Sequence, residues 1–192
     1  RIHVLHRAGK EGLGPAYRAG FRVALDMGAD LVVQMDADFS HDPRYLPDLL
    51  QAALAADVVI GSRYVPGGGV RDWPLRRLML SKFANRYVSV VTRLKVGDAT
   101  AGFRCYTRRA LERLGVDSIE SNGYAFQVEM THRSREAGLR IVEVPIIFTD
   151  RTMGKSKISR AVLLESMVMP FRLRLGQKRP GAWRPASQST KK

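Results

Sequence analysis

The stretch LVVQMDAD, residues 31–38, decides the fold, because a short and mostly apolar run leads directly into two aspartates. A run of this kind is typical of a buried strand in a parallel sheet. In an extended segment, residues i and i+2 point the same way, so the carboxylates of Asp36 and Asp38 are expected to face one point. Open α/β sheets bind ligands at the carboxyl ends of their strands. The stretch therefore predicts an acidic site just beyond a buried strand.

Outward from this strand, apolar runs alternate with helical patterns, which favours a three-layer α/β sandwich around a mostly parallel central sheet. Asp42 and Pro43 are residue types found at helix N-termini, and they predict a helix up to about residue 56. We expect further strands at 2–5, 58–60, 103–106, 140–143 and 146–148, and further helices at 13–27, 74–94, 108–114 and 124–137.

The 192 residues fit one compact domain with enough apolar residues to bury a core. The sequence begins with RIHVL, which reads like the interior of a domain, so we expect a preceding piece that carries the first strands of the fold. Cys105 is the single cysteine, which favours a reducing compartment and a place in the core. We assign residues 1–171 to one catalytic domain and residues 172–192 to a basic, disordered tail.

The formal net charge of +14 calls for an anionic partner or an anionic surface. Seven Lys or Arg and no Asp or Glu occur in residues 172–192. Charge of this kind suits nucleic acid and acidic lipid equally well, so it does not choose between them.

Residues 161–171 are nearly all apolar, with Glu165 as the single charge. A helix needs about 20 residues to cross a bilayer, so this segment is too short. It either lies in the membrane interface, anchored by Arg172 and Arg174, or packs as a core or dimerising helix. The sequence leaves both interpretations open.

The two aspartates after the strand favour a divalent cation. Like charges this close repel each other unless a cation lies between them, and Mg²⁺ or Mn²⁺ is held by one or two carboxylates together with a substrate diphosphate. An Asp-x-Asp alone is common in turns, and only the position of Asp36 and Asp38 after a buried strand favours the metal site. His41 is a further candidate ligand, for which a structural role is the favoured interpretation.

Several other segments are candidates for binding phosphate or sugar. Residues 10–16 place glycines before a helix, which suits phosphate but also an ordinary helix-entry turn. Residues 151–157 combine arginine, glycine, serine and lysine, as in a phosphate-binding loop or a solvated basic loop. The remaining candidates are the cations Arg63 and Arg104 for phosphate, and Gln127 and Glu129 for sugar hydroxyls.

Taken in order, these motifs resemble the dolichol-phosphate (polyprenol-phosphate) mannose synthase family, inverting glycosyltransferases with the GT-A fold. The resemblance runs from about residue 1 to residue 169 and leaves only the tail outside. The motifs that carry it are Gly12-Leu13-Gly14, Asp36-Ala37-Asp38, Gly61-Ser62-Arg63-Tyr64, Gly102-Phe103-Arg104, residues 123–129, Glu143-Val144-Pro145-Ile146 and residues 151–157.

The resemblance implies GDP-mannose as the donor, a polyprenyl or dolichyl phosphate as the acceptor, and Mg²⁺ or Mn²⁺ held by Asp36 and Asp38. It implies catalytic roles for Asp38, Arg63 and Arg151. Family members also carry two N-terminal nucleotide-binding motifs that this sequence lacks. By the same resemblance, the donor contacts are Lys10, Gly12, Leu13, Gly14, Asp36, Ala37, Asp38, Gln127, Glu129, Arg151 and Lys157, and the acceptor phosphate contacts are Arg63, Arg104 and Arg151.

An acceptor of this kind is a phosphate monoester, which is already anionic at neutral pH, so the reaction requires no dedicated general base. Direct displacement would invert the anomeric centre and give a β-linked product. We expect a protein attached peripherally to the cytoplasmic face of a membrane, with a membrane-anchoring partner subunit as a possible addition and no nucleic acid as partner.

Three alternatives remain open. The first keeps the fold and changes the donor to UDP-glucose or another nucleotide sugar. The second is a non-catalytic basic module that binds membrane or nucleic acid, which explains the charge but not the paired aspartates. The third is a scaffold subunit that retains the fold without activity.

Overall fold

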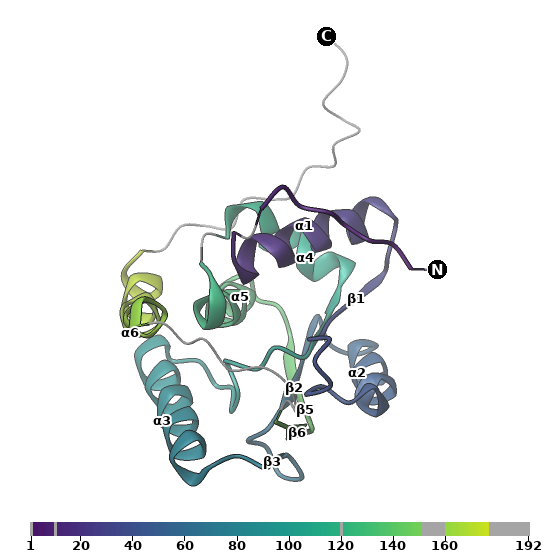
Figure 1. Ribbon diagram of the computed structural model, residues 1–192. Helices are drawn as coiled ribbons and strands as arrows, with labels where there is room; N and C mark the ends of the chain where they lie inside the picture. The colour runs from purple at the N-terminus through teal and green to yellow at the C-terminus, as the bar shows by residue number, and fades with distance from the viewer. Residues whose placement is uncertain (1, 10, 120, 151–159, 177–192) are drawn as a thin grey trace.

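A four-stranded sheet forms the centre of the structure, a computed structural model that describes residues 2–9, 11–119, 121–150 and 160–176. Helices cover both faces of the sheet (Figure 1). Two 3₁₀ helices span Pro43–Tyr45 and Val116–Ser118. The α-helices are α1 (Leu13–Asp26), α2 (Leu46–Ala53), α3 (Leu75–Thr92), α4 (Arg108–Leu114), α5 (Gly123–Glu136) and α6 (Arg160–Leu175), and the strands are β1 (Leu31–Gln34), β2 (Val58–Ser62), β3 (Gly69–Arg71), β4 (Arg104–Thr107), β5 (Ile141–Pro145) and β6 (Ile147–Thr149).

The strands of the central sheet lie in the order β1-β4-β2-β5. β4 is antiparallel to both β1 and β2, whereas β2 and β5 are parallel, so β1, β2 and β5 run in the same direction. The mostly parallel sheet expected from the sequence is therefore confirmed, with β4 as the one opposed strand among the described four. Because β1, β2 and β5 share a direction, their carboxyl ends meet at one edge of the sheet.

The core lies in two layers, one on each face of the sheet, and the alternation of side chains along the strands divides them. Val58 and Ile60 of β2 pack toward α1, α4 and α5, whereas Val59 packs toward α2. Cys105 of β4 is fully buried on the α2 side, and burial raises the pKa of its thiol to about 11. The thiol therefore stays protonated and serves as a core residue, as the sequence indicated.

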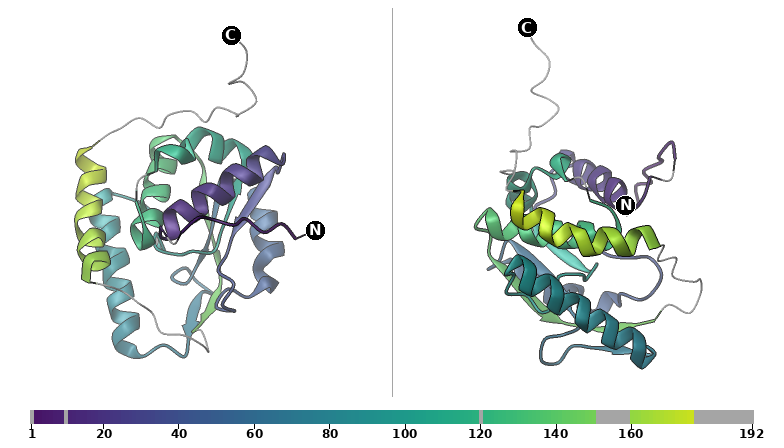
Figure 2. Two further views of the ribbon diagram at one scale, coloured as in Figure 1. Left: turned by 45° about the horizontal axis from the view of Figure 1, so that its top comes forward. Right: turned by 90° about the vertical axis from the view of Figure 1, so that its left-hand side faces the viewer.

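A smaller part of the fold lies beyond the carboxyl end of β2. There β3 and β6 form a parallel two-stranded sheet, joined to the central sheet where the amide of Gly69 donates to the carbonyl of Ile146. α3 and α6 lie side by side, as the right-hand view of Figure 2 shows. The two helices flank one side of the domain.

The structure differs from the sequence-based expectations at both ends. The strand expected at residues 2–5 is absent, and Ile2 is 94% exposed, because no described strand lies beside this segment to complete its hydrogen bonds. Near the other end, α6 continues to Leu175, past the boundary expected at residue 171, while residues 177–192 of the expected tail lie outside the described part. Among the described helices, none is long and apolar enough to span a bilayer.

Candidate active site

The loop after β1 holds the two aspartates in a fixed arrangement. The backbone N–H of Asp36 donates to Nδ1 of His41 at 2.9 Å, and the Tyr17 hydroxyl donates to Oδ1 of Asp36 at 2.9 Å. The backbone N–H and hydroxyl of Ser40 both donate to Oδ1 of Asp38, at 3.1 and 2.5 Å. The loop therefore fixes both carboxylates through bonds to its own backbone and to α1.

His41 is buried and holds this loop in position. It is 3% exposed, and its ring stacks on Phe103 at 5.0 Å and meets Phe148 edge-on at 5.4 Å between centroids. Burial lowers the pKa of His41, although Asp36 and Asp38 act in the opposite direction. Because Nδ1 accepts the Asp36 amide, the neutral ring carries its proton on Nε2. His41 is thus a structural histidine that positions the acidic loop.

Tyr17 was not identified from the sequence, although it contacts the carboxylate directly. Its ring stacks between Phe21 and Phe126, which fixes its hydroxyl beside Asp36. Burial, together with the charge of Asp36, raises the pKa of Tyr17 well above its usual value, so the hydroxyl remains a proton donor. The available signal was the i, i+4 spacing of Tyr17 and Phe21, which marks a buried face of the helix.

The acidic loop suits a hard divalent cation. Both carboxylates influence the pKa of His41, which places them near the same ring. A β-carbon at Gly102 would lie 3.8 Å from Oδ2 of Asp36, which is an ordinary van der Waals distance, so this glycine lies directly beside the carboxylate. Within the described ranges, no set of three or more His, Cys, Asp or Glu side chains forms a metal site. Two carboxylates supplemented by substrate phosphates are nevertheless a common way of holding Mg²⁺.

Gly12, which precedes α1, and Gly14, in the first turn of α1, both serve close packing. The backbone N–H of Gly14 donates to Oδ1 of Asn122 at 3.1 Å, and a β-carbon at Gly14 would lie 2.2 Å from the carbonyl oxygen of Ser121. Gly12 adopts φ 104°, a conformation that favours glycine. Packing against residues 121–122 thus explains both glycines, and Gly14 already has a partner within the protein. Leu13 is 40% exposed between them, and Lys10 lies outside the described residues.

Arg63 is buried in an ion pair. Its Nε and Nη2 atoms each lie 2.6 Å from a different carboxylate oxygen of Asp98, which is fully buried. Thr100 accepts a further bond from Nη2 at 2.9 Å, and the guanidinium lies over the rings of Trp73 and Phe148. The pairing neutralises most of the charge that was expected to bind acceptor phosphate. Within the described part of the chain, Nη1 is the guanidinium nitrogen of Arg63 without a recorded hydrogen bond.

The role expected for Arg104 does not fit its position. Its side chain is fully buried, with Nε donating to the carbonyl of Ala101, Nη2 to that of Ala99 and Nη1 to the hydroxyl of Thr131, each at 2.8 Å. A guanidinium held in this way supports the 99–101 turn and is not available to a lipid phosphate. We therefore remove Arg104 from the acceptor site.

The two candidates for binding sugar hydroxyls are both buried. Oε2 of Glu129 accepts bonds from the backbone N–H and the hydroxyl of Ser121, and Oε1 lies 2.5 Å from Arg133. Glu129 thereby holds the 121–122 turn, and this position does not fit the expected sugar contact. Gln127 is 3% exposed, and its Oε1 has no hydrogen-bond partner among the described residues. The other two expected phosphate ligands, Arg151 and Lys157, lie outside the described residues.

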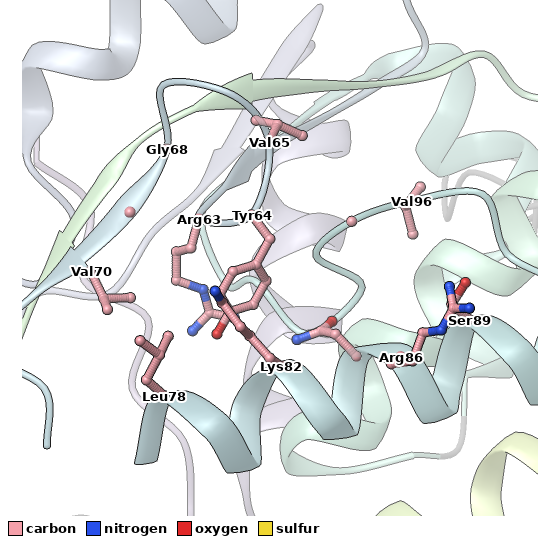
Figure 3. A pocket seen from close by; sticks show the side chains of 13 residues that line it. Arg63, Tyr64, Val65, Gly68, Val70, Leu78, Lys82, Arg86, Ser89 and Val96 are labelled. Carbon is pink, nitrogen blue, oxygen red and sulfur yellow. The ribbon is translucent and has the colours of Figure 1, made fainter. Parts of the chain in front are cut away.

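A cationic pocket of about 570 Å³ lies beside the buried arginine. Lys82 and Arg86 enter it from α3, while Arg63 and Tyr64 enter from the segment after β2 (Figure 3). No Asp or Glu lines the pocket, and no ion pair to Lys82 or Arg86 is formed among the described residues. Neither Lys82 nor Arg86 was identified as a site residue from the sequence.

The acidic loop and the pocket are connected through aromatic side chains. Phe148 contacts the ring of His41, whose Nδ1 holds the Asp36 backbone, and the same Phe148 ring lies 5.6 Å from the guanidinium carbon of Arg63. Arg63 in turn lines the pocket. Glu143 of β5 fixes the paired Asp98 by accepting its backbone N–H at 3.0 Å. A short chain of contacts through His41 and Phe148 therefore joins the acidic loop to Arg63 and the pocket that it lines.

The chain is similar in sequence to known glycosyltransferases. Residues 1–115 match the family description "Glycosyl transferase family 2". The chain is 50% identical over 167 residues to an undecaprenyl-phosphate mannosyltransferase of Micrococcus luteus, covering 87% of this chain and 69% of the relative. It is also 50% identical over 168 residues to a polyprenol monophosphomannose synthase of Mycolicibacterium smegmatis, covering 87% of this chain and 63% of the relative.

Solved structures with a similar fold include glucosyl-3-phosphoglycerate synthase of Mycobacterium tuberculosis. Its complex with Mn²⁺, UDP-glucose and phosphoglyceric acid has a TM-score of 0.59 and 18% identity, covering 86% of this chain and 56% of that chain. Its complex with Mn²⁺, UDP and phosphoglyceric acid has a TM-score of 0.60 and 18% identity, covering 94% of this chain and 61% of that chain. The chain thus spans a little over half the length of these structures. The family match over residues 1–115, the two relatives at 50% identity and the shared GT-A fold all agree that this chain belongs to glycosyl transferase family 2.

Proposed function

We propose that the chain transfers mannose from GDP-mannose to the phosphate of a polyprenyl or dolichyl lipid. The names of the two relatives at 50% identity support the sugar and the lipid acceptor. The observation that carries the proposal is that contacts through His41, Phe148 and Arg63 join an acidic loop to a cationic pocket. Transfer between two anionic substrates needs sites of this kind, one that holds a metal with a diphosphate and one that holds a phosphate directly.

On the donor side, Asp36 and Asp38 hold Mg²⁺ or Mn²⁺, and the backbone of Ala37 contacts the donor. When bound, the metal supplies positive charge that stabilises the departing nucleotide diphosphate. The residues of this chain keep the site in place before the donor arrives: His41 fixes the Asp36 backbone and Tyr17 fixes its carboxylate. Such preorganisation avoids the cost of reorienting charged groups during the reaction. Lys10, Arg151 and Lys157 remain proposed donor contacts.

On the acceptor side, Lys82 and Arg86 attract the lipid phosphate into the pocket, and Arg63 contributes Nη1, the nitrogen that Asp98 does not engage. Arg151 remains a proposed contact to the same phosphate. The phosphate is already ionised at neutral pH, so these residues act by orientation and by balancing charge. The new bond forms between a phosphate oxygen and the anomeric carbon, while the bond from that carbon to the diphosphate oxygen breaks, which inverts the configuration.

The location of the acceptor implies attachment to a membrane. Polyprenyl phosphates reside in bilayers, so the protein works at a membrane surface, for which we propose the cytoplasmic face. A membrane-anchoring partner subunit is a further component that this arrangement accommodates.

The test is transfer of radiolabel from GDP-mannose to a short polyprenyl phosphate in detergent, with Mg²⁺, with Mn²⁺ and with a chelator. It is run on the 192-residue chain and on the chain extended at its N-terminus with the corresponding residues of the Micrococcus luteus relative, because the match covers 69% of that relative. Metal-dependent formation of mannosyl lipid is the expected result. Product from UDP-glucose in place of GDP-mannose would overturn the sugar assignment, and no product from either protein with any donor would overturn the enzymatic proposal.

A further inference from the structure

Phe39 places an exposed aromatic ring in the middle of the acidic loop, directly after Asp38. The residue is 89% exposed, whereas the two residues that follow it, Ser40 and His41, are 2% and 3% exposed. A single exposed apolar side chain is common on protein surfaces and would carry no inference by itself. The backbone of the same residue supplies the second observation.

Phe39 adopts a backbone conformation that bulky residues rarely use. Its φ is 62°, in the left-handed region, and the other described residues besides glycine with positive φ are Asp72 and Arg93. Arg93 is the residue that ends α3, where this conformation is common, and aspartate tolerates it because its side chain is short and polar. Neither reason applies to Phe39. A phenylalanine here costs free energy that a glycine would avoid.

Hydrogen bonds on both sides of Phe39 impose this conformation. The backbone N–H and hydroxyl of Ser40 donate to Oδ1 of Asp38, and the backbone N–H of Asp36 donates to Nδ1 of His41. The loop closes through these bonds and leaves the ring outside. The ring therefore projects from a segment that is fixed on both sides, beside a carboxylate of the candidate metal site. Strained residues of this kind are concentrated at sites that bind substrates.

We propose that the ring of Phe39 stacks on the sugar ring of the donor and turns its anomeric carbon toward the acceptor. The proposal rests on the proposed function, in which Asp36 and Asp38 hold a metal together with the donor diphosphate. The sugar is bonded directly to that diphosphate, so it is the part of the donor next to the metal-bound phosphates. A hexose carries C–H groups on its ring faces, and such groups pack on an exposed aromatic ring. A sugar held in this way is oriented for attack.

The other apolar parts of the substrates fit Phe39 less well. The nucleobase is separated from the diphosphate by the ribose, so it is further along the donor from the metal. The prenyl chain belongs to the acceptor, and none of the residues 36–41 lines the cationic pocket proposed for the acceptor phosphate. The position of Phe39 therefore favours the transferred sugar.

The experiment measures the Kd of GDP-mannose and of GDP by calorimetry, with Mg²⁺ and without acceptor, for the two proteins used in the transfer assay. The ratio of the Kd of GDP-mannose to that of GDP isolates the contribution of the sugar. Phe39→Gly should raise this ratio about 3–10-fold, because the ring contact is lost. Phe39→Tyr retains the ring and should leave the ratio within about twofold. Phe83→Ala, which removes a 70% exposed ring on α3, is the control and should not change it.

Thermal melting without ligand separates a sugar contact from a packing role. Phe39→Gly relieves the left-handed backbone and loses little packing, so it should melt at the same temperature as the unchanged protein or up to about 4 °C higher. Asp72→Gly is the matched control for the glycine substitution, since Asp72 is exposed and has φ 61°. It should melt in the same range and keep the ratio of the two Kd values unchanged.

Three results would overturn the proposal. The first is a melting temperature of Phe39→Gly that is lower by more than about 4 °C, which would make the ring a packing element. The second is an equal loss of affinity for GDP-mannose and GDP, which would assign the contact to the nucleotide. The third is an unchanged ratio together with a raised KM for polyprenyl phosphate, which would assign the ring to the acceptor.

The outcome for Phe39 is independent of the outcome for mannosyl transfer. Donor binding is measured without acceptor, so absence of transfer would count against the proposed function alone. The same ratio measured with UDP-glucose and UDP tests the contact for a different donor. A rise of that ratio in Phe39→Gly, with GDP-mannose unbound, would support the sugar contact and overturn only the choice of mannose.

Discussion

The acidic loop at residues 36–41 and the cationic wall of the pocket hold their charges in different ways. In the loop, each carboxylate receives hydrogen bonds from neutral groups, namely the Tyr17 hydroxyl and the backbone and hydroxyl of Ser40. In the wall, Arg63 is paired with the buried Asp98, whereas Lys82 and Arg86 are exposed. Neutral hydrogen-bond donors hold a carboxylate in position without cancelling its charge, so the carboxylate can still bind a cation. In a buried ion pair, the charge of the arginine is balanced by its partner and is not available to a ligand.

The three cations of the pocket wall have different roles. Arg63 is mainly a structural element, because its guanidinium ties the end of β2 to the 98–100 turn. Lys82 and Arg86 keep their charge available to an anion. Charge in this pocket therefore comes from α3 more than from the arginine that the sequence singled out.

The largest expected effect comes from breaking the buried pair. Asp98→Asn leaves the guanidinium of Arg63 buried without a counterion, which should lower the free energy of unfolding by about 3–5 kcal/mol. Urea unfolding followed by circular dichroism measures it. Asp42→Asn is the control, because Asp42 forms a half-exposed pair with Arg44, and asparagine can still cap the following turn. Equal stability of the two variants would mean that Arg63 is not held by Asp98.

The second effect tests the acidic loop. Asp36→Asn preserves the shape of the side chain and its bond to Tyr17 but removes its charge, so turnover should fall by about 10²–10³-fold with little change in thermal stability. Radiolabel transfer at saturating metal gives the rate. Asp48→Asn, an exposed position in the first turn of α2, should keep full activity. A normal rate for Asp36→Asn would remove Asp36 from the metal site.

Local pattern predicted the centre of the fold well. The apolar runs at 31–35 and 58–60 became β1 and β2, and the position of Asp36 and Asp38 directly beyond β1 is confirmed. These features depend on neighbours in the chain, which a sequence displays directly. The expected strand at 2–5 was wrong for the complementary reason, since a strand needs a partner and none of the described strands lies beside it.

Roles that depend on distant partners could not be predicted. Arg63 directly follows Ser62 and Arg104 lies two residues after Gly102, and nothing local reveals that Asp98 and Thr131 are their partners in the interior. The glycine at position 14 suggested phosphate binding, yet its partner is Asn122, which lies 108 residues further along the chain. The residue type and its neighbours in the sequence show that a side chain could bind a ligand. Only the tertiary structure shows whether that side chain is already bonded to another part of the protein.

The third prediction tests whether Lys82 and Arg86 of α3 supply the charge that binds the acceptor. The double variant Lys82→Ser/Arg86→Ser should raise the KM for polyprenyl phosphate by about 10-fold or more and leave the KM for GDP-mannose nearly unchanged, because these cations belong to the proposed acceptor site and not to the proposed donor site. Arg113→Ser, an exposed cation on α4, is the control. The dependence of the acceptor KM on salt should weaken in the double variant. An unchanged acceptor KM would transfer the role to Arg63 or to residues outside the pocket.

The smallest effect concerns the support beneath the acidic loop. His41→Leu removes the acceptor for the Asp36 backbone N–H, which should lower turnover by about 5–10-fold through misplacement of the carboxylate, with the KM values little changed. His41→Asn supplies a side-chain oxygen close to the position of Nδ1, so it should restore much of the rate although it cannot stack on Phe103 as the imidazole does. If the two variants lose activity equally, ring packing supports the loop. If asparagine rescues the rate, the hydrogen bond to Asp36 is what holds the carboxylate in place.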